Sequence, residues 1–165
     1  QEYNPKYQLS FIHMAMNDFK TGLPLYENRL NDGNPIHPQT KMPTRLELGF
    51  LDYWDGKQHC DHLLLVYEQG LGDNIQIYRY MIELARKLPN MQISFFCNNG
   101  ISNIFDSPCN NLILITNLNQ YTTYNYKLYT MSLPFILNCT KIVPNKDNYI
   151  YVNPDKNKYW KNNIG

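Results

Sequence analysis

The segment His62-Leu63-Leu64-Leu65-Val66-Tyr67, followed by Glu68-Gln69-Gly70-Leu71-Gly72-Asp73, decides the fold. The first half is a continuous apolar run, which predicts a strand that is buried on both faces, as in a parallel sheet. The second half carries two glycines, which predict a sharp turn. Over residues 74–88 the apolar side chains recur at three- and four-residue spacing, so a helix is expected there.

A second strand is predicted at residues 91–96, so residues 62–96 are expected to form a strand–helix–strand unit. The later pattern predicts a short helix near 99–106, a strand at 112–116, an extended stretch at 126–131, a short helix at 133–137, a strand at 149–152 and a helix from 154 that Asn153 caps. The predicted fold class is therefore α/β, a Rossmann-like half-domain with a parallel sheet.

The N-terminal part of the chain predicts two short helices over residues 6–31, joined at Asn17-Asp18. The pair is interpreted either as the last unit of a helical repeat array or as a simple helical hairpin. Residues 34–61 contain three prolines and are expected to form an irregular arm, with Trp54 packed on the domain that follows. The predicted organisation is a hairpin at 1–33, an arm at 34–61 and a Rossmann-like half-domain at 62–165.

Composition narrows the function classes. A formal net charge of +1 over 165 residues argues against a nucleic-acid partner, which normally requires a basic excess. No apolar run approaches the roughly 20 residues of a membrane span. The four cysteines show no C-x-x-C spacing and are expected to be free thiols in a reducing compartment, so a cytoplasmic location is expected.

Two other clusters contain residue types that could form a site. His59-Cys60-Asp61-His62 has metal-capable side chains, but neighbouring residues of a strand point to opposite faces, so a zinc site is disfavoured and no metal is expected. The tyrosines between residues 121 and 129 would suit stacking against bases or sugars. Their near-alternation favours a strand instead.

The glycine-bearing turn is the predicted ligand site, because ligands of parallel α/β sheets gather at the carboxyl ends of the strands. Its glycines allow close approach of backbone amides, and the following helix dipole favours an anion. The turn lacks the third glycine of the dinucleotide fingerprint and the Gly-Lys-Ser/Thr of a phosphate-binding loop.

Asp73 has two interpretations, as the N-cap of the helix or as a general base that takes a proton from an attacking hydroxyl. Glu68 is expected either to hydrogen-bond the turn or to face a ligand. The candidate substrate-binding residues share this turn and the helix after it: Glu68, Gln69, Gly70, Gly72, Gln76 and Arg79.

Residues 68–76 (Glu-Gln-Gly-Leu-Gly-Asp-Asn-Ile-Gln), with Arg79-Tyr80 after them, resemble a signature of a bacterial-type family. Its members carry tetratricopeptide repeats followed by a heptosyltransferase-like glycosyltransferase of the GT-B class. Residues 17–29 are similar to the family's final repeat helices, Trp54-Asp55-Gly56 stands before the first strand as it does there, and Met131-Ser132-Leu133-Pro134 is similar to a later stretch. The resemblance covers most of residues 9–165.

The resemblance implies two Rossmann-like halves that face each other across a cleft, the first holding the acceptor and the second the nucleotide-sugar. The proposed base of the family maps onto Gly72-Asp73. Arg79 is expected to steady a phosphate or carboxylate, or else to form a surface salt bridge along the helix. The donor-binding motifs belong to a second half that residues 1–165 do not contain.

Two hypotheses follow. In the first, the chain is the acceptor-side half of a sugar-nucleotide-dependent glycosyltransferase, which is not competent alone and binds no cofactor of its own. Its partners would be a second Rossmann-like half, in cis or in trans, and a sugar or protein acceptor, while the complete enzyme would use a nucleotide-sugar donor. In the second, the chain is a non-catalytic interaction or structural module of a larger assembly.

Overall fold

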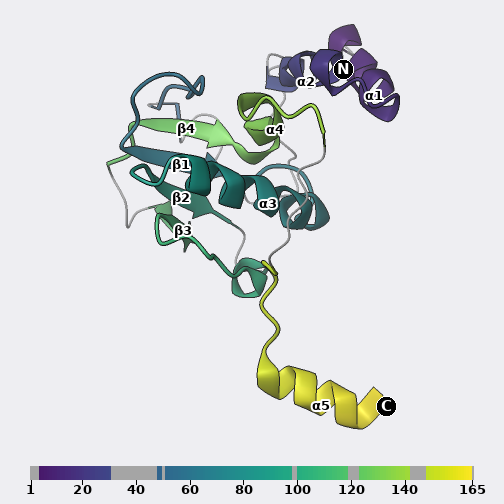
Figure 1. The fold of residues 1–165 in the computed structure, drawn as a ribbon, viewed down its shortest axis with the longest axis vertical. Coiled ribbons are helices and arrows are strands. Elements are labelled where there is room, and N and C mark those ends of the chain that lie inside the picture. Colours follow the sequence, from purple (N-terminus) through teal and green to yellow (C-terminus); the bar gives the residue numbers. More distant parts are fainter. Residues whose placement is uncertain are drawn as a thin grey trace.

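The computed structural model describes residues 4–30, 48–49, 51–97, 100–118, 123–141 and 148–164. Four parallel strands form one sheet in the order β3-β2-β1-β4 (Figure 1). The elements in chain order are α1 (Pro5–Ala15), α2 (Phe19–Tyr26), the 3-10 turn η1 (Glu27–Leu30), β1 (His62–Val66), α3 (Leu71–Lys87), β2 (Gln92–Phe96), η2 (Ser102–Ile104), β3 (Leu112–Ile115), β4 (Tyr126–Tyr129), η4 (Thr130–Ser132), α4 (Leu133–Ile136) and α5 (Pro154–Ile164).

The sheet is built around β1, the apolar run of the sequence. Leu64 is in register with Ser94 of β2 on one side and with Lys127 of β4 on the other. The four side chains from Leu63 to Val66 are all 0% exposed, so both faces of β1 are covered. This confirms the α/β class, with a Rossmann-like half-domain that follows a helical pair.

Helix α3 supplies the main helical cover of the sheet. It is amphipathic, and the residues of its buried side are Asn74, Ile77, Tyr78, Met81, Ile82, Leu84 and Ala85. The ring of Tyr78 stacks on Phe105 with 4.3 Å between the centroids and lies against Phe95 of β2. Apolar burial of this kind is the dominant favourable term in folding.

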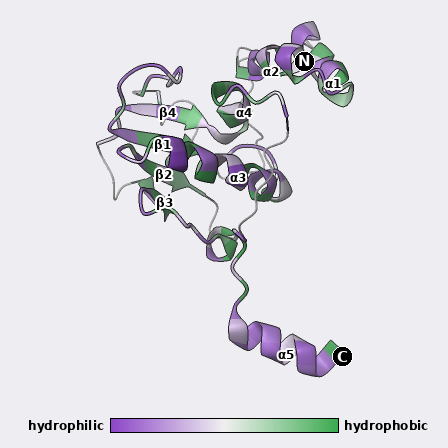
Figure 2. Cartoon of the chain, viewed as in Figure 1, coloured by the Kyte–Doolittle hydropathy of each residue, from purple (hydrophilic) through white to green (hydrophobic). Residues whose placement is uncertain are grey.

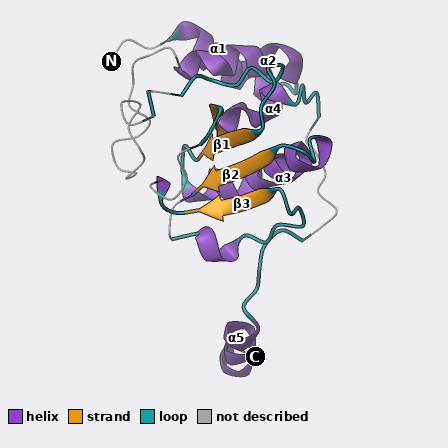
Figure 3. Cartoon of the chain, turned by 90° about the vertical axis from the view of Figure 1, so that its left-hand side faces the viewer, coloured by secondary structure: helices purple, strands orange, loops and turns teal. Residues whose placement is uncertain are grey.

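The predicted N-terminal helices are confirmed as α1 and α2, which lie side by side next to α4 (Figure 3). Asn17 turns the chain with a positive φ of 60°, and Asp18 caps α2 by accepting a hydrogen bond from the Thr21 amide at 3.2 Å. The two helices approach closely at Gly22, where an added Cβ would lie 2.8 Å from Cγ of Met14.

The last helix, α5, differs from the others because none of its residues is buried. It is largely hydrophilic, whereas strands β1, β2 and β3 are largely hydrophobic (Figure 2). The predicted cap is confirmed, since Oδ1 of Asn153 accepts hydrogen bonds from the amides of Asp155 and Lys156, both at 3.0 Å. None of the helices in the described part of the chain combines the length and the apolar character needed to cross a bilayer.

Two predicted elements were wrong. Residues 149–152 are not a strand: Ile150 makes one isolated bridge with Phe105, and the side chains of Ile150, Tyr151 and Val152 are exposed. An apolar run forms a strand only when a neighbouring strand is available to pair with it. In place of a helix over 99–106, the described residues 100–106 contain only the three-residue η2.

Of the arm predicted at 34–61, the structure describes residues 48–49 and 51–61, so the prediction for residues 34–47 and 50 lies outside the described residues. Tyr53 bridges Lys127 and adds one pair at the β4 edge of the sheet. Trp54 is 4% exposed, which confirms its packing on the domain. Tyr121 is not described, while Tyr126 and Tyr129 lie in β4 as the strand interpretation predicts.

Candidate functional site

The glycine-bearing turn lies at the topological switch point of the sheet. From β1 the chain moves to β2 and β3 on one side, and β4 lies on the other side of β1. Ligands of open α/β sheets bind outside the carboxyl ends of the strands at such a point. The two strand ends are joined there, because Oε1 of Glu68, just after β1, accepts a hydrogen bond from the Met131 amide, just after β4, at 3.0 Å.

A pocket of about 480 Å³ lies between the helical hairpin, the turn and α3. The hairpin contributes a mostly apolar wall of Tyr7, Phe11, Met14, Phe19, Leu23 and Tyr26. The turn and α3 contribute Gln69, Asp73, Gln76, Ile77, Arg79 and Tyr80, and the segment after β4 contributes Met131, Pro134, Cys139 and Lys141. Four of the seven predicted site residues therefore line one pocket, whereas Glu68, Gly70 and Gly72 do not.

One of the two interpretations of Asp73 made it the N-cap of α3, and this prediction is wrong. The helix begins at Leu71 and its N-cap is Gly70, so Asp73 is the third residue of the first turn. Its Oδ2 reaches back and accepts a hydrogen bond from the Gly70 amide at 2.8 Å, the carboxylate half of a capping box. Asp73 is exposed and lines the pocket, and its Oδ1 makes no hydrogen bond with the residues that the structure describes.

The turn is held by Asn74, a residue that the sequence reasoning did not single out. Its side chain is 0% exposed and its Nδ2 donates to the carbonyls of Glu68 and Gly70 at 2.9 and 2.8 Å. Its Oδ1 accepts from the Thr130 hydroxyl at 3.3 Å, which ties the turn to the end of β4. The signal available in the sequence was an amide residue at a position of the helix that faces the core.

Gln69 lines the pocket and has an unusual backbone conformation. Its φ of 65° is uncommon for a residue with a side chain, and such conformations persist where the surroundings impose them. Gly72, in contrast, is exposed and an added Cβ would meet no atom within 4 Å, so the fold itself does not require glycine there.

Glu68 is enclosed by protein groups. The residue is 1% exposed, and its carboxylate accepts hydrogen bonds from Nε and Nη2 of Arg29 at 3.2 and 2.6 Å. Burial raises the pKa of the Glu68 carboxyl, and the Arg29 guanidinium opposes part of that rise. The first expected role was a hydrogen bond with the turn, but the Glu68 carboxylate bonds to Arg29 of the hairpin and to the Met131 amide after β4. Its role toward a ligand stays a prediction.

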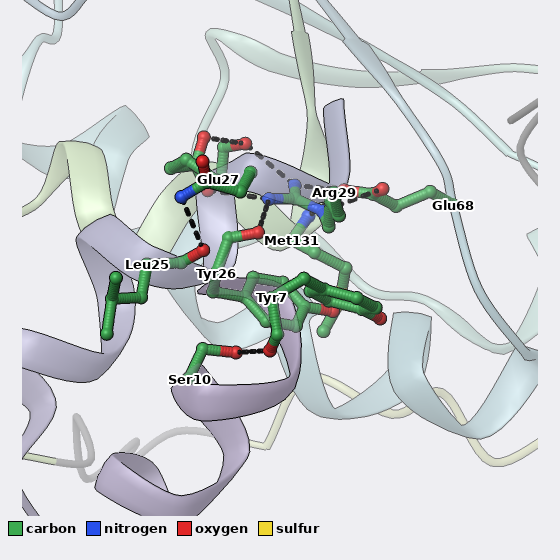
Figure 4. A network of polar contacts seen from close by, with 10 residues as sticks. Tyr7, Ser10, Leu25, Tyr26, Glu27, Arg29, Glu68 and Met131 are labelled. Atoms are coloured by element: carbon green, nitrogen blue, oxygen red, sulfur yellow. Dashed lines mark hydrogen bonds and ion pairs between the residues drawn. The ribbon is translucent and has the colours of Figure 1, made fainter. Parts of the chain in front are cut away.

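Arg29 is the second residue that the sequence reasoning missed. Its Nη1 donates to Glu27 at 2.6 Å and its Nη2 also donates to the Ser132 hydroxyl at 2.8 Å, while the Tyr26 ring lies 4.5 Å from Cζ (Figure 4). Burial lowers the pKa of Arg29, but the Glu68 and Glu27 carboxylates outweigh it and the pKa is raised. The guanidinium therefore stays charged, and no local sequence signal marks it.

Arg79 and Gln76 lie one turn apart on α3 and both line the pocket. Nε of Arg79 donates to the Gln76 carbonyl at 2.9 Å, and within the described residues Arg79 makes no ion pair. Its Nη groups thus have no ion-pair partner along the helix. Lys141 adds a second, exposed cation to the pocket lining.

The side chains of His59, Asp61 and His62 are engaged in two different contacts. His59 and Asp61 form an exposed ion pair at 3.1 Å, while Nε2 of His62 lies 2.8 Å from the Ser94 hydroxyl. Burial raises the pKa of the Cys60 thiol to about 11. In the part of the chain that the structure describes, no three His, Cys, Asp or Glu residues are grouped to hold a metal ion.

The pocket offers one available carboxylate oxygen, side-chain amides, a guanidinium and aromatic surface. Such a combination suits a ligand with a hydroxyl group, further polar groups and an apolar or sugar-like face, because few oriented polar groups in an apolar pocket give specificity. The comparisons with known proteins add nothing to this chemistry: no family model, no curated protein and no solved structure matches the chain.

Proposed function

We propose that this chain is the acceptor-side half of a sugar-nucleotide-dependent glycosyltransferase, with the acceptor held in the pocket between the hairpin and α3. One observation carries the proposal. Four residues of the motif, Gln69, Asp73, Gln76 and Arg79, line a single pocket at the carboxyl end of β1. This is where α/β folds bind their ligands.

In this proposal Asp73 acts as general base. Its Oδ2 is fixed by the Gly70 amide, and its Oδ1 takes the proton of the acceptor hydroxyl. The hydroxyl oxygen attacks the anomeric carbon of the donor, the bond from that carbon to the diphosphate breaks, and the nucleoside diphosphate leaves with the bonding electron pair. A second Rossmann-like half would bind the donor and stabilise the charge that develops on the diphosphate.

The second candidate function is a non-catalytic interaction module. It is favoured by the arrangement at the switch point, where Glu68 is 1% exposed and is paired with Arg29, a residue of the hairpin. In this alternative the Asp73 carboxylate serves only to cap α3 through the Gly70 amide. The pocket would then hold a segment of a partner protein.

The experiment uses the natural full-length polypeptide and measures nucleoside diphosphate release from a panel of sugar nucleotides, with and without mixed sugar and peptide acceptors. The decisive variant is Asp73→Asn, because an amide oxygen still accepts from Gly70 but does not act as a base. Turnover is expected to fall by about 100-fold or more. Glu83→Gln is the matched control, since it removes a carboxylate from the same helix outside the pocket lining.

Unchanged turnover in Asp73→Asn would reject the base assignment. Absence of donor-dependent release for every sugar nucleotide, in a polypeptide shown by mass to include a second half, would reject the transferase proposal in favour of the interaction module. Equal losses of turnover in Asp73→Asn and Glu83→Gln would mean that the effect comes from a disturbed helix and not from the loss of a reacting carboxylate.

A further inference from the structure

We infer that Arg29 is a positioning residue: it holds the helical hairpin over the carboxyl ends of β1 and β4 and thereby fixes the apolar wall of the pocket, although it does not line the pocket itself. The inference concerns the geometry of the pocket and applies to both candidate functions.

The contacts of Arg29 join three parts of the chain. From η1, its guanidinium reaches Glu68 after β1 and Ser132 in η4 after β4, so one side chain spans the switch point (Figure 4). The Arg29 side chain is 6% exposed and that of Glu68 is 1% exposed. Two of its nitrogens meet the two oxygens of Glu68, and a paired contact of this kind fixes orientation as well as distance.

The same network reaches both sides of the pocket. On the hairpin side, the Tyr26 ring lies 4.5 Å from Cζ of Arg29 and contacts the rings of Tyr7 and Phe11 at 5.5 and 6.0 Å. All three rings line the pocket. On the other side, Glu68 accepts from the amide of Met131, which also lines it. Moving Arg29 therefore displaces the wall that carries these rings.

The hairpin depends on this contact more than the α/β part does. Within the described residues, the hydrophobic core cluster contains no residue of α1 or α2, although Leu23 and Tyr26 are buried, and Leu30 of η1 packs against the cluster from outside. Removal of Arg29 would leave the Glu68 carboxylate buried without its counter-charge, an arrangement that is strongly unfavourable. Undocking of the hairpin relieves it by admitting water while the sheet stays folded. A lysine keeps the charge but lacks the planar fork and is expected to hold the hairpin less well.

The test uses Cys139 as a reporter, because its free thiol lines the pocket and is half-buried. Cys109 is the internal control: it is also free and half-buried, but its Sγ faces the Ile82 carbonyl, outside the pocket lining. Alkylation by iodoacetamide is followed at each cysteine by peptide-resolved mass spectrometry. In Arg29→Met the Cys139 rate is expected to rise by about tenfold or more, with Cys109 unchanged, because local opening limits the labelling of enclosed groups.

Arg29→Lys is expected to give a smaller rise at Cys139, again without a change at Cys109. Arg29→Met/Glu68→Gln keeps an oxygen for the Met131 amide and removes the uncompensated charge, so it is expected to return part of the protection. An equal rise at both cysteines in Arg29→Lys would overturn the inference, since it would indicate general destabilisation. Wild-type rates in Arg29→Met would overturn it as well. If Arg29→Met does not fold, Arg29→Lys decides, and no substrate is needed for any of these measurements.

Discussion

The α/β part and the helical hairpin are held in place by different kinds of interaction. In the α/β part, β1 contributes four consecutive apolar side chains that are 0% exposed, and α3 packs six apolar residues against the sheet. The hairpin buries Ser10, Gly22, Leu23 and Tyr26, and reaches the switch point through Arg29 and Glu27. The α/β part has a large apolar core, whereas the hairpin meets the switch point through directed polar contacts together with the packing of Leu30 against that core.

This difference shows how the pocket is made. Burial of apolar surface is non-directional and supplies stability, whereas a paired guanidinium and carboxylate fix orientation. The pocket lies between the two parts, with its polar residues on the stable part and its aromatic wall on the positioned part. Substitutions in the sheet should therefore lower the stability of the whole chain, whereas substitutions in the hairpin should first alter the wall of the pocket.

The largest effect is expected from Leu64→Ala in the middle of β1. The side chain is 0% exposed, and the free energy of unfolding should fall by about 2–5 kcal/mol through lost burial and a cavity. Urea denaturation followed by far-UV circular dichroism measures it. Leu71→Ala is the control, because Leu71 is 47% exposed and a change within about 0.5 kcal/mol is expected. Comparable losses of stability in the two variants would contradict the conclusion that the buried side chains of β1 hold the α/β part together.

A pair of glycine substitutions sharpens the comparison. In Gly22→Ala the new methyl would lie 2.8 Å from Cγ and 3.1 Å from the backbone nitrogen of Met14. The two helices must separate, so the hairpin should lose about 1–3 kcal/mol of local stability. Hydrogen exchange measured by mass spectrometry should then show faster exchange over residues 5–30 and little change in β1.

Gly72→Ala is the matched variant in the other part. Its Cβ would meet no atom within 4 Å, and alanine favours a helix over glycine by about 1 kcal/mol, so exchange should stay the same or slow. A loss of turnover in Gly72→Ala without a loss of stability would support close approach of a ligand to this backbone. If Gly72→Ala accelerated exchange in the hairpin as much as Gly22→Ala does, the proposed difference between the two parts of the molecule would be refuted.

Sequence patterns within short segments correctly predicted the elements that such segments determine by themselves. The apolar run of β1 and the helical spacing of α3 lie within short segments, and both elements are present. The start of α3 was predicted three residues late, because Asp fits the N-cap and also the third position, from which its carboxylate reaches back to Gly70. The strand at 149–152 was wrong because pairing depends on distant residues.

The same limit applies to the candidate site. Gln69, Asp73, Gln76 and Arg79 belong to one contiguous motif, and helical spacing brings three of them to one side of α3, where they line the pocket. Arg29 and Glu68 are 39 residues apart, and nothing in the sequence around either one indicates the other. The residue that positions the pocket wall therefore became visible only in the structure.

The smallest effect is expected at Asp18, which caps α2 within the hairpin. The pKa of its carboxyl is lowered by the hydrogen bond with Thr21 first and by that with His13 second, the latter at 2.9 Å. A lowered pKa means that the ionised form stabilises the folded hairpin. This contribution is present above the ordinary pKa of Asp and is lost as the pH falls through the lower folded value. The contact between them is weak because the His13 and Asp18 side chains are 29% and 43% exposed.

An NMR titration of the Thr21 amide should give a midpoint below that of an unstructured Asp. The variant Asp18→Asn should abolish this titration while the amides of β1 remain unaffected. A midpoint at or above the ordinary value would show that the cap does not discriminate between the charge states, and acid would then weaken the hairpin no more than the sheet.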